Sequence, residues 1–139
     1  MRRASPIAPT TLRTSMRWIV DGMNVIGSRP DGWWRDRHAA MVRLVDRLER
    51  WAADEGADVT VMFEGPPRPP IESPVVEVAH AARRGADAAD HEIVRRIDAA
   101  DDPAAIRVVT SDRVLADQAR ARGAAVHPAE AFRNEIDPR

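Results

Sequence analysis

Short apolar runs, each ending on polar residues, alternate with longer amphipathic stretches along the chain. The runs 18–20, 59–63 and 106–110 are rich in β-branched residues, which is typical of buried strands. Two weaker runs, 74–79 and 124–126, predict further short strands. Strands that alternate with helices predict an α/β fold, a three-layer sandwich around a mostly parallel sheet of about five strands. With right-handed crossovers, the economical strand order is 3-2-1-4-5.

The clearest predicted helix begins at Arg37 and ends at Gly56, which is expected to cap it. Apolar residues recur along one stripe of this helix at helical spacing, and Arg and Glu fill the opposite face. The stripe consists of Met41, Leu44, Val45, Leu48, Trp51 and Ala52. A second long helix is predicted over 87–100, a third through Leu115, and a helical turn near 129–132.

The composition is that of an ordinary globular domain, with 139 residues, 44% hydrophobic and 31% charged. All 21 basic residues are arginine and the net charge is −1, which argues against a bulk polycation but allows a local basic rim. The chain contains no lysine and no cysteine, so lysine nucleophiles, P-loops, disulfides and zinc–cysteine sites are excluded.

Three expectations about organisation follow from the same rows. No apolar run approaches the roughly 18 residues of a membrane span, and residues 1–15 lack the apolar core of a signal peptide. We therefore expect a cytoplasmic protein without a membrane partner. We expect a disordered extension over 1–15, one domain over 16–133 and a tail over 134–139.

The first strand ends abruptly on a carboxylate, in the sequence Asp21-Gly22-Met23-Asn24. The carboxyl edge of a parallel sheet is the usual place for α/β active sites. Gly22 lets the backbone turn without a Cβ, and Asn24 places an amide beside the acid. The same residue types also cap and turn chains without further function, so this motif alone leaves both interpretations open.

Two further acidic segments are expected at the same edge. The predicted strand order puts Asp112 beside Asp21, and Asp90 lies in the inward row of the second long helix. Asp87 shares that side of the helix, although an acid in a first turn is also an ordinary cap, and Ser111-Asp112 is open to the same reading. Carboxylates gathered without cysteine point to a hard cation, Mg²⁺ or Mn²⁺.

Three motifs together resemble a known family. They are Asp21-Gly22-x-Asn24-Val25-Ile26-Gly27, the helix start at 85–94 with Asp87 and Asp90, and Val109-Thr110-Ser111-Asp112-Arg113. In this order they resemble the NYN domain, in its YacP-like branch of the PIN-like, flap-nuclease-related nucleases. The resemblance covers roughly 17–132. It implies a PIN-like parallel α/β domain with an acidic, metal-dependent site that cleaves RNA, leaving a 5′-phosphate and a 3′-hydroxyl.

The resemblance also assigns roles to residues. Asp21, Asp90 and Asp112 are the expected catalytic acids and metal ligands, with Asp87 as a further ligand and Asn24 as a catalytic amide. Ser111 is expected to help position the substrate. Apart from the resemblance, a rim of arginines is expected to bind flanking phosphates, although any single arginine is better explained as solvated surface. The candidates for this rim are Arg113, Arg83, Arg84, Arg29 and Arg35. One departure matters: many PIN-like sites carry another acid at the position of Ala116, and Asp117 should point elsewhere.

The expected partner is RNA (mRNA, rRNA or tRNA), with the ribosome as a candidate partner and the oligomeric state open. An endonuclease is the favoured form of the enzyme. The rival hypothesis is a non-catalytic RNA- or ribosome-binding module with a degenerate site. An aspartyl-phosphate phosphatase is disfavoured because Met23 stands where a second acid is needed, and a response-regulator receiver because it needs a lysine. The adjacent Trp33 and Trp34 either stack on bases or, more simply, pack in the core.

Overall fold

The computed structural model describes residues 16–82, 85 and 87–138. Within these residues, five strands form one sheet with the order β3-β2-β1-β4-β5, and all neighbouring strands pair in parallel. The strands are β1 (Arg17–Asp21), β2 (Asp58–Phe63), β3 (Glu77–His80), β4 (Ile106–Val109) and β5 (Ala125–His127). The predicted fold class and strand order are confirmed.

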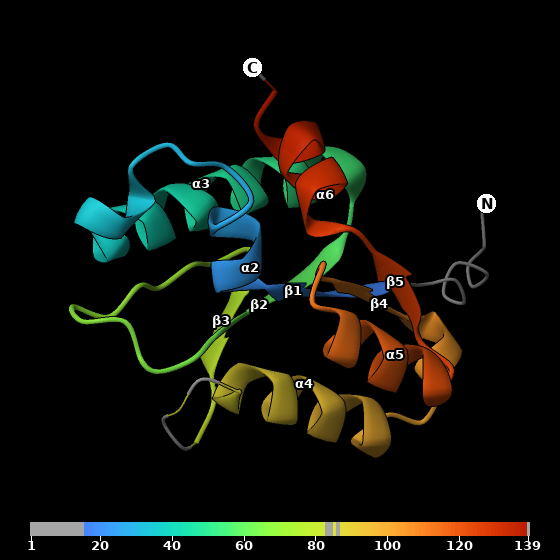
Figure 1. The fold of residues 1–139 in the computed structure, drawn as a ribbon. Coiled ribbons are helices and arrows are strands. Elements are labelled where there is room, and N and C mark those ends of the chain that lie inside the picture. The colour runs from blue at the N-terminus through green and yellow to red at the C-terminus, as the bar shows by residue number, and fades with distance from the viewer. Residues whose placement is uncertain (1–15, 83–84, 86, 139) are drawn as a thin grey trace, which may run out of the picture.

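Helices cover both faces of this sheet, which gives three layers (Figure 1). On one side lie α2 (Gly22–Ile26), α3 (Arg37–Glu55) and α6 (Ala129–Ile136), and on the other lie α4 (Ala88–Ala99) and α5 (Arg113–Ala121). Two short 3₁₀ turns, η2 (Trp33–Arg35) and η3 (Pro103–Ala105), precede α3 and β4. No helix in the described part of the chain is long and apolar enough to cross a membrane.

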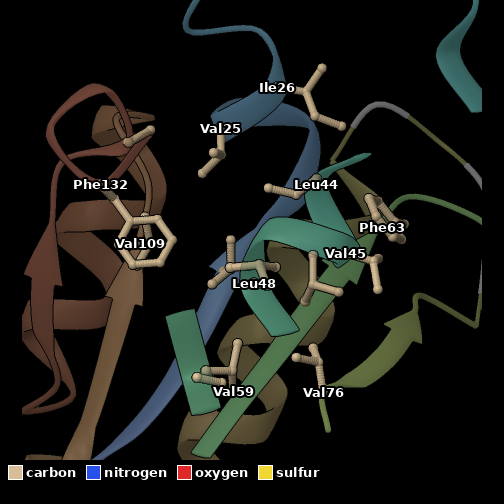
Figure 2. Packing of buried hydrophobic residues seen from close by; sticks show 14 of the residues in the cluster. Val25, Ile26, Leu44, Val45, Leu48, Val59, Phe63, Val76, Val109 and Phe132 are labelled. Carbon is tan, nitrogen blue, oxygen red and sulfur yellow. The ribbon is translucent and has the colours of Figure 1, made fainter. Parts of the chain in front are cut away.

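Two hydrophobic clusters hold the layers together, because successive strand residues point to opposite faces. Val20 and Val109 face the first cluster, under α2, α3 and α6, where Leu48 and Phe132 are fully buried (Figure 2). Ile19, one residue away from Val20, faces the second cluster, under α4 and α5. Because side chains alternate between the two faces, the position of a residue along its strand determines the face of the sheet on which its side chain lies.

The long helix α3 forms as its periodicity predicts. The Asp36 carboxylate accepts a hydrogen bond from the Ala39 amide at 3.0 Å and caps the beginning of the helix. Gly56 ends it in the left-handed conformation, with φ of 64°, which a side chain with a Cβ rarely adopts. Because α3 connects the neighbouring parallel strands β1 and β2, it runs antiparallel to them, and its first turn lies at the carboxyl edge of the sheet.

The helix α2 follows β1 directly, at a position where only a turn was expected. Two further elements differ from the expectation. β3 begins at Glu77 rather than at Pro74, because the Ser73 hydroxyl accepts hydrogen bonds from the amides of Val75 and Val76 and holds this segment in a turn.

The second difference is at the end of the chain. α6 continues to Ile136, so the expected boundary at 133 falls inside a helix. Asp137 then forms ion pairs with Arg29, Arg47 and Arg133 at 3.2, 2.9 and 3.3 Å. Residues 134–137 are thus packed against the domain. The expected extension, 1–15, lies outside the described residues.

Candidate functional site

Asp21 is the last residue of β1 and is almost fully buried, with 7% of its surface exposed. It shares the face of Ile19, and its neighbour in the β2 register, Met62, also belongs to the cluster under α4 and α5. The carboxylate therefore points to the side of the sheet from which these two helices supply acids.

α2 begins directly after Asp21, and Gly22 makes this possible by its size. A Cβ at Gly22 would lie 2.6 Å from Phe63 Cε1, which is closer than real Cβ contacts allow, and 3.1 Å from the Met62 carbonyl oxygen, which is unusually tight. Gly22 does not have a positive φ. The expected freedom to turn is therefore not the reason for glycine here; close packing of α2 on the end of β2 is.

Thr110 holds the Asp21 carboxylate in place. Its hydroxyl donates a hydrogen bond to Asp21 Oδ2 at 2.9 Å and accepts one from the Asp112 amide at 3.1 Å, and only 1% of the residue is exposed. Val20 pairs with Val109, so the next residue on each strand brings Thr110 level with Asp21. The sequence analysis gave Thr110 no role. A hydroxyl residue directly after the strand predicted to lie beside the first one could have indicated this contact.

Asp112 serves the fold and the site together. Its carboxylate accepts a hydrogen bond from the Leu115 amide at 3.0 Å and caps α5. The same turn is fastened to α2, because the Ser111 amide donates to Asn24 Oδ1 at 2.7 Å. The Ser111 hydroxyl accepts from the Ala129 amide at the beginning of α6 at 2.9 Å. Hydrogen bonds thus link the turn that carries Ser111 and Asp112 to Asn24 on α2 and to the beginning of α6.

The two acids at the beginning of α4 differ in environment. Asp90 is half-buried beside the buried residues Ala89 and Ile93. The periodicity predicts an inward-facing side chain, and the structure buries this side chain only in part. Asp87 is exposed and stands at the N-cap position, yet its side chain makes no capping hydrogen bond. A purely capping role therefore does not explain Asp87.

The carboxylates are close enough to change one another's ionisation. Burial, opposed by the Thr110 hydrogen bond and reinforced by the charges of Asp90, Asp112 and Glu64, raises the pKa of Asp21 to about 7. Burial and the charges of Asp112, Asp87 and Glu64, partly offset by His91, raise the pKa of Asp90 to about 6. These acids therefore share one electrostatic environment, although they come from four separate segments.

Glu64 is the acid that sequence reasoning missed. It follows the end of β2, next to β1, and its charge raises the pKa of both Asp21 and Asp90. The signal was available, because Glu64 ends the second strand as Asp21 ends the first and Asp112 follows the fourth. Glu64 thus adds negative charge to the cluster, whereas the position of Ala116, one turn into α5, carries none. Ala116 itself is buried, with 7% exposed.

The chemistry of this cluster suits a hard divalent cation, because all its charged groups are carboxylates and their repulsion is relieved by positive charge. Among the described residues, however, no three His, Asp or Glu side chains are grouped closely enough to hold one metal ion. The donor set therefore fits Mg²⁺ or Mn²⁺ in type, and the side chains as placed do not form a closed coordination shell.

The expected arginine rim is only partly present. Arg113 is the exposed first residue of α5, directly after Asp112. Arg35 is also exposed, with its guanidinium 5.9 Å from the centre of the Trp34 ring. Arg29, by contrast, is only 8% exposed and binds Asp137 and Asn134 beneath the end of α6. It is therefore buried and does not lie on the predicted rim.

Other sequence predictions have mixed outcomes. Arg83 and Arg84 lie outside the described residues. Asp117 is exposed on α5 and lies 3.9 Å from Arg120, pointing away from the acids as expected. Trp33 packs against the hydrophobic cluster as the simpler interpretation predicts, whereas Trp34 is half-exposed, with 50% of its surface accessible.

Comparisons with known proteins agree with the fold. The family described as the YacP-like NYN domain matches residues 18–139. The crystal structure of Rae1 (YacP) from Bacillus subtilis in its W164L mutant superposes with a TM-score of 0.73 and 24% identity, over 88% of this chain and 76% of that one. The structure of Rae1 (YacP) without that mutation gives 0.69 and 21%, over 89% and 74%. These TM-scores establish a shared fold. No curated protein matches the chain. Since the family match spans nearly all of the described residues, the chain belongs to the YacP-like NYN domain family.

Proposed function

We propose that this protein is a metal-dependent ribonuclease that hydrolyses phosphodiester bonds within RNA and leaves a 5′-phosphate and a 3′-hydroxyl. The observation that carries the proposal is the buried carboxylate of Asp21, whose pKa is raised to about 7 and which faces three further acids at a sheet edge. Keeping such a group at a buried site destabilises the fold, and strongly perturbed carboxylates of this kind concentrate at catalytic sites. Membership of the family supports RNA as the substrate class.

The roles follow from the contacts of each residue. Asp21, Asp90, Asp112 and Glu64 are the groups that would hold Mg²⁺ or Mn²⁺, which when bound supplies Lewis acidity toward the phosphate and lowers the pKa of water. Thr110 fixes the orientation of the Asp21 carboxylate through its 2.9 Å hydrogen bond.

The polar groups around the acids would position the RNA. The Asn24 carbonyl is engaged by the Ser111 amide, so the Asn24 NH₂ group is the donor left to meet a phosphate oxygen. The Ser111 hydroxyl accepts from Ala129 and can still donate its own proton. Arg113 and Arg35 would contact phosphates that flank the reacting one.

The test is cleavage of end-labelled mixed RNA in Mg²⁺, in Mn²⁺ and in chelator, followed by analysis of the new ends. We expect cleavage only with metal, and its loss in Asp21→Asn, Asp90→Asn and Asp112→Asn. Asp117→Asn, on the exposed side of α5, is the matched control and should retain activity. If Asp90→Asn keeps most of the activity while Asp87→Asn loses it, Asp87 takes the place of Asp90 as a ligand.

One observation favours a second candidate, a non-catalytic RNA- or ribosome-binding module. Within the described ranges no metal-holding group is assembled, and Ala116 stands where the resemblance to PIN-like sites leads us to expect a further acid. RNA that is bound but remains uncut in every metal would support this module and refute the nuclease. The ribosome is tested as a partner by measuring cleavage of total RNA, for the nuclease, or binding of the protein, for the module, with and without ribosomes.

A further inference from the structure

A groove of about 500 Å³ opens beside the acidic cluster, and we call it the methionine groove. It lies between α2, the first turns of α3 and the loop after β2. The lining residues that matter below are Met23, Arg37, Met41, Phe63, Glu64 and Arg68. A volume of this size is within the range of sites that enclose small organic groups.

The floor of the groove is apolar. Met23 and Met41 are both half-buried and pack on the first hydrophobic cluster, leaving part of each side chain facing the groove. Phe63 closes the floor beneath them and is 1% exposed. Thioether side chains are polarisable and adapt their shape to flat aromatic faces, which makes such a floor suited to a planar ring.

The walls of the groove carry positive charge and are held in place. Arg37 and Arg68, both exposed, stand on opposite walls, on α3 and on the loop after β2. The guanidinium of Arg37 lies 5.2 Å from the centre of the Trp33 ring, and His38 Nε2 lies 2.8 Å from the Pro69 carbonyl oxygen. The second contact ties the loop to α3 and so fixes the width of the groove.

The groove is continuous with the acidic cluster. Glu64 lines the groove and also raises the pKa of Asp21 and Asp90, so the apolar floor begins where the carboxylates end. An occupant suited to this groove therefore combines a flat apolar part with negative charge that the two arginines can meet, and it extends past Glu64 toward the acids. A nucleotide of an RNA strand has this chemistry.

We propose that the methionine groove holds one unpaired nucleobase of the RNA, stacked on Met23 and Met41, with its flanking phosphates met by Arg37 and Arg68. This rests on the proposed ribonuclease function, since it assigns a subsite to the same substrate. An apolar floor contacts the face of a base and not its hydrogen-bonding edge, so the groove accepts any of the four bases.

The experiment measures binding of a short, labelled single-stranded RNA to the full-length Asp21→Asn protein. A single abasic residue is moved along the oligonucleotide one position at a time. We expect one position at which removing the base weakens binding by roughly 5-fold or more, the lower end of what stacking on an aromatic or apolar surface contributes. Met41→Ala should weaken binding of the intact RNA by a similar factor and add nothing at that abasic position, because both changes remove the same contact.

Arg68→Ala provides a second variant that leaves the hydrophobic cluster untouched. It should lower the slope of log affinity against log salt concentration by about 1. The matched control is Arg50→Ala, an exposed arginine near the end of α3 that is far from the groove, and it should leave this slope unchanged. Thermal melts check that each variant is folded.

The outcomes separate the two proposals. If the unmodified protein cleaves RNA with metal but every abasic position is tolerated, or if the Met41→Ala and abasic losses add, the groove is not a base site and the nuclease stands. If the abasic position and Arg68 both matter but no metal supports cleavage, the groove stands and the nuclease falls. RNA that is neither bound nor cut overturns both.

Discussion

Replacing Asp21 by Asn should stabilise the metal-free protein at neutral pH while abolishing its activity. Asn has the same shape, and its carbonyl oxygen can still accept the hydrogen bond from Thr110. It carries no charge, so burial and the carboxylates of Asp90, Asp112 and Glu64 no longer penalise it. The substitution therefore removes a destabilising charge without removing a contact.

The magnitude follows from the pKa of Asp21, which rises from 3.8 to about 7 on folding. At roughly 1.4 kcal/mol per pKa unit, the charged carboxylate lowers the free energy of unfolding by on the order of 4 kcal/mol well above pH 7. Because the pKa is raised in the folded state, the folded chain binds more protons than the unfolded chain between about pH 4 and pH 7. Stability from this group therefore falls as pH rises, and about 2.5 kcal/mol of the fall lies between about pH 5 and about pH 8.

The assay is denaturant unfolding in chelator at about pH 5 and about pH 8. The difference in unfolding free energy, Asp21→Asn minus the unmodified protein, should grow by about 2.5 kcal/mol between the two conditions. Asp46→Asn, which removes an exposed carboxylate from α3, is the control for loss of one negative charge and should show no such growth. A difference that is constant with pH, or that shrinks as pH rises, would refute the reasoning.

Three further predictions concern the metal, the packing of α2 and the arginines. Mg²⁺ or Mn²⁺ at 100 times its dissociation constant should add about 2.7 kcal/mol of stability, seen as a higher melting temperature, and Asp112→Asn should blunt this rise because Asn keeps the helix cap but loses the charge. An unchanged melting temperature with metal would contradict the first part. Gly22→Ala should cost about 1–3 kcal/mol in denaturant unfolding, because its Cβ would lie 2.6 Å from Phe63 Cε1, and no loss would mean that the Phe63 ring yields. Arg29→Ala should lower the stability of the fold but leave the salt dependence of RNA binding unchanged, because Arg29 is bound to Asp137. A reduced slope of log affinity against log salt concentration would show that Arg29 contacts RNA.

The sequence by itself determined the fold class and the strand order. The apolar runs that became β1, β2 and β4 and the stripe that became α3 are local patterns, and local pattern is what periodicity detects. Right-handed crossovers then leave few parallel arrangements for five short strands, so the order followed from handedness rather than from any particular contact. The same logic brought Asp21 and Asp112 to neighbouring strand ends.

The tertiary structure decided which side chains meet at that edge. Thr110 binds Asp21 because β1 and β4 pair in one register, and a shift of one residue would turn either side chain to the opposite face. Glu64 joins the acids because β2 lies beside β1. The sequence shows that an acid follows the second strand, but only the pairing of the two strands brings its charge close to Asp21.

The burial of Arg29 is the plainest case of what sequence could not give. A Gly/Pro-rich loop with arginines predicts an exposed rim, but residues more than 100 positions later, Asn134 and Asp137, fold back to bind the guanidinium. The α6 segment that carries them was expected to be only a turn and a tail. Periodicity reports which residues prefer an apolar environment, whereas the partner of a charged group is set by chain segments that meet only after folding.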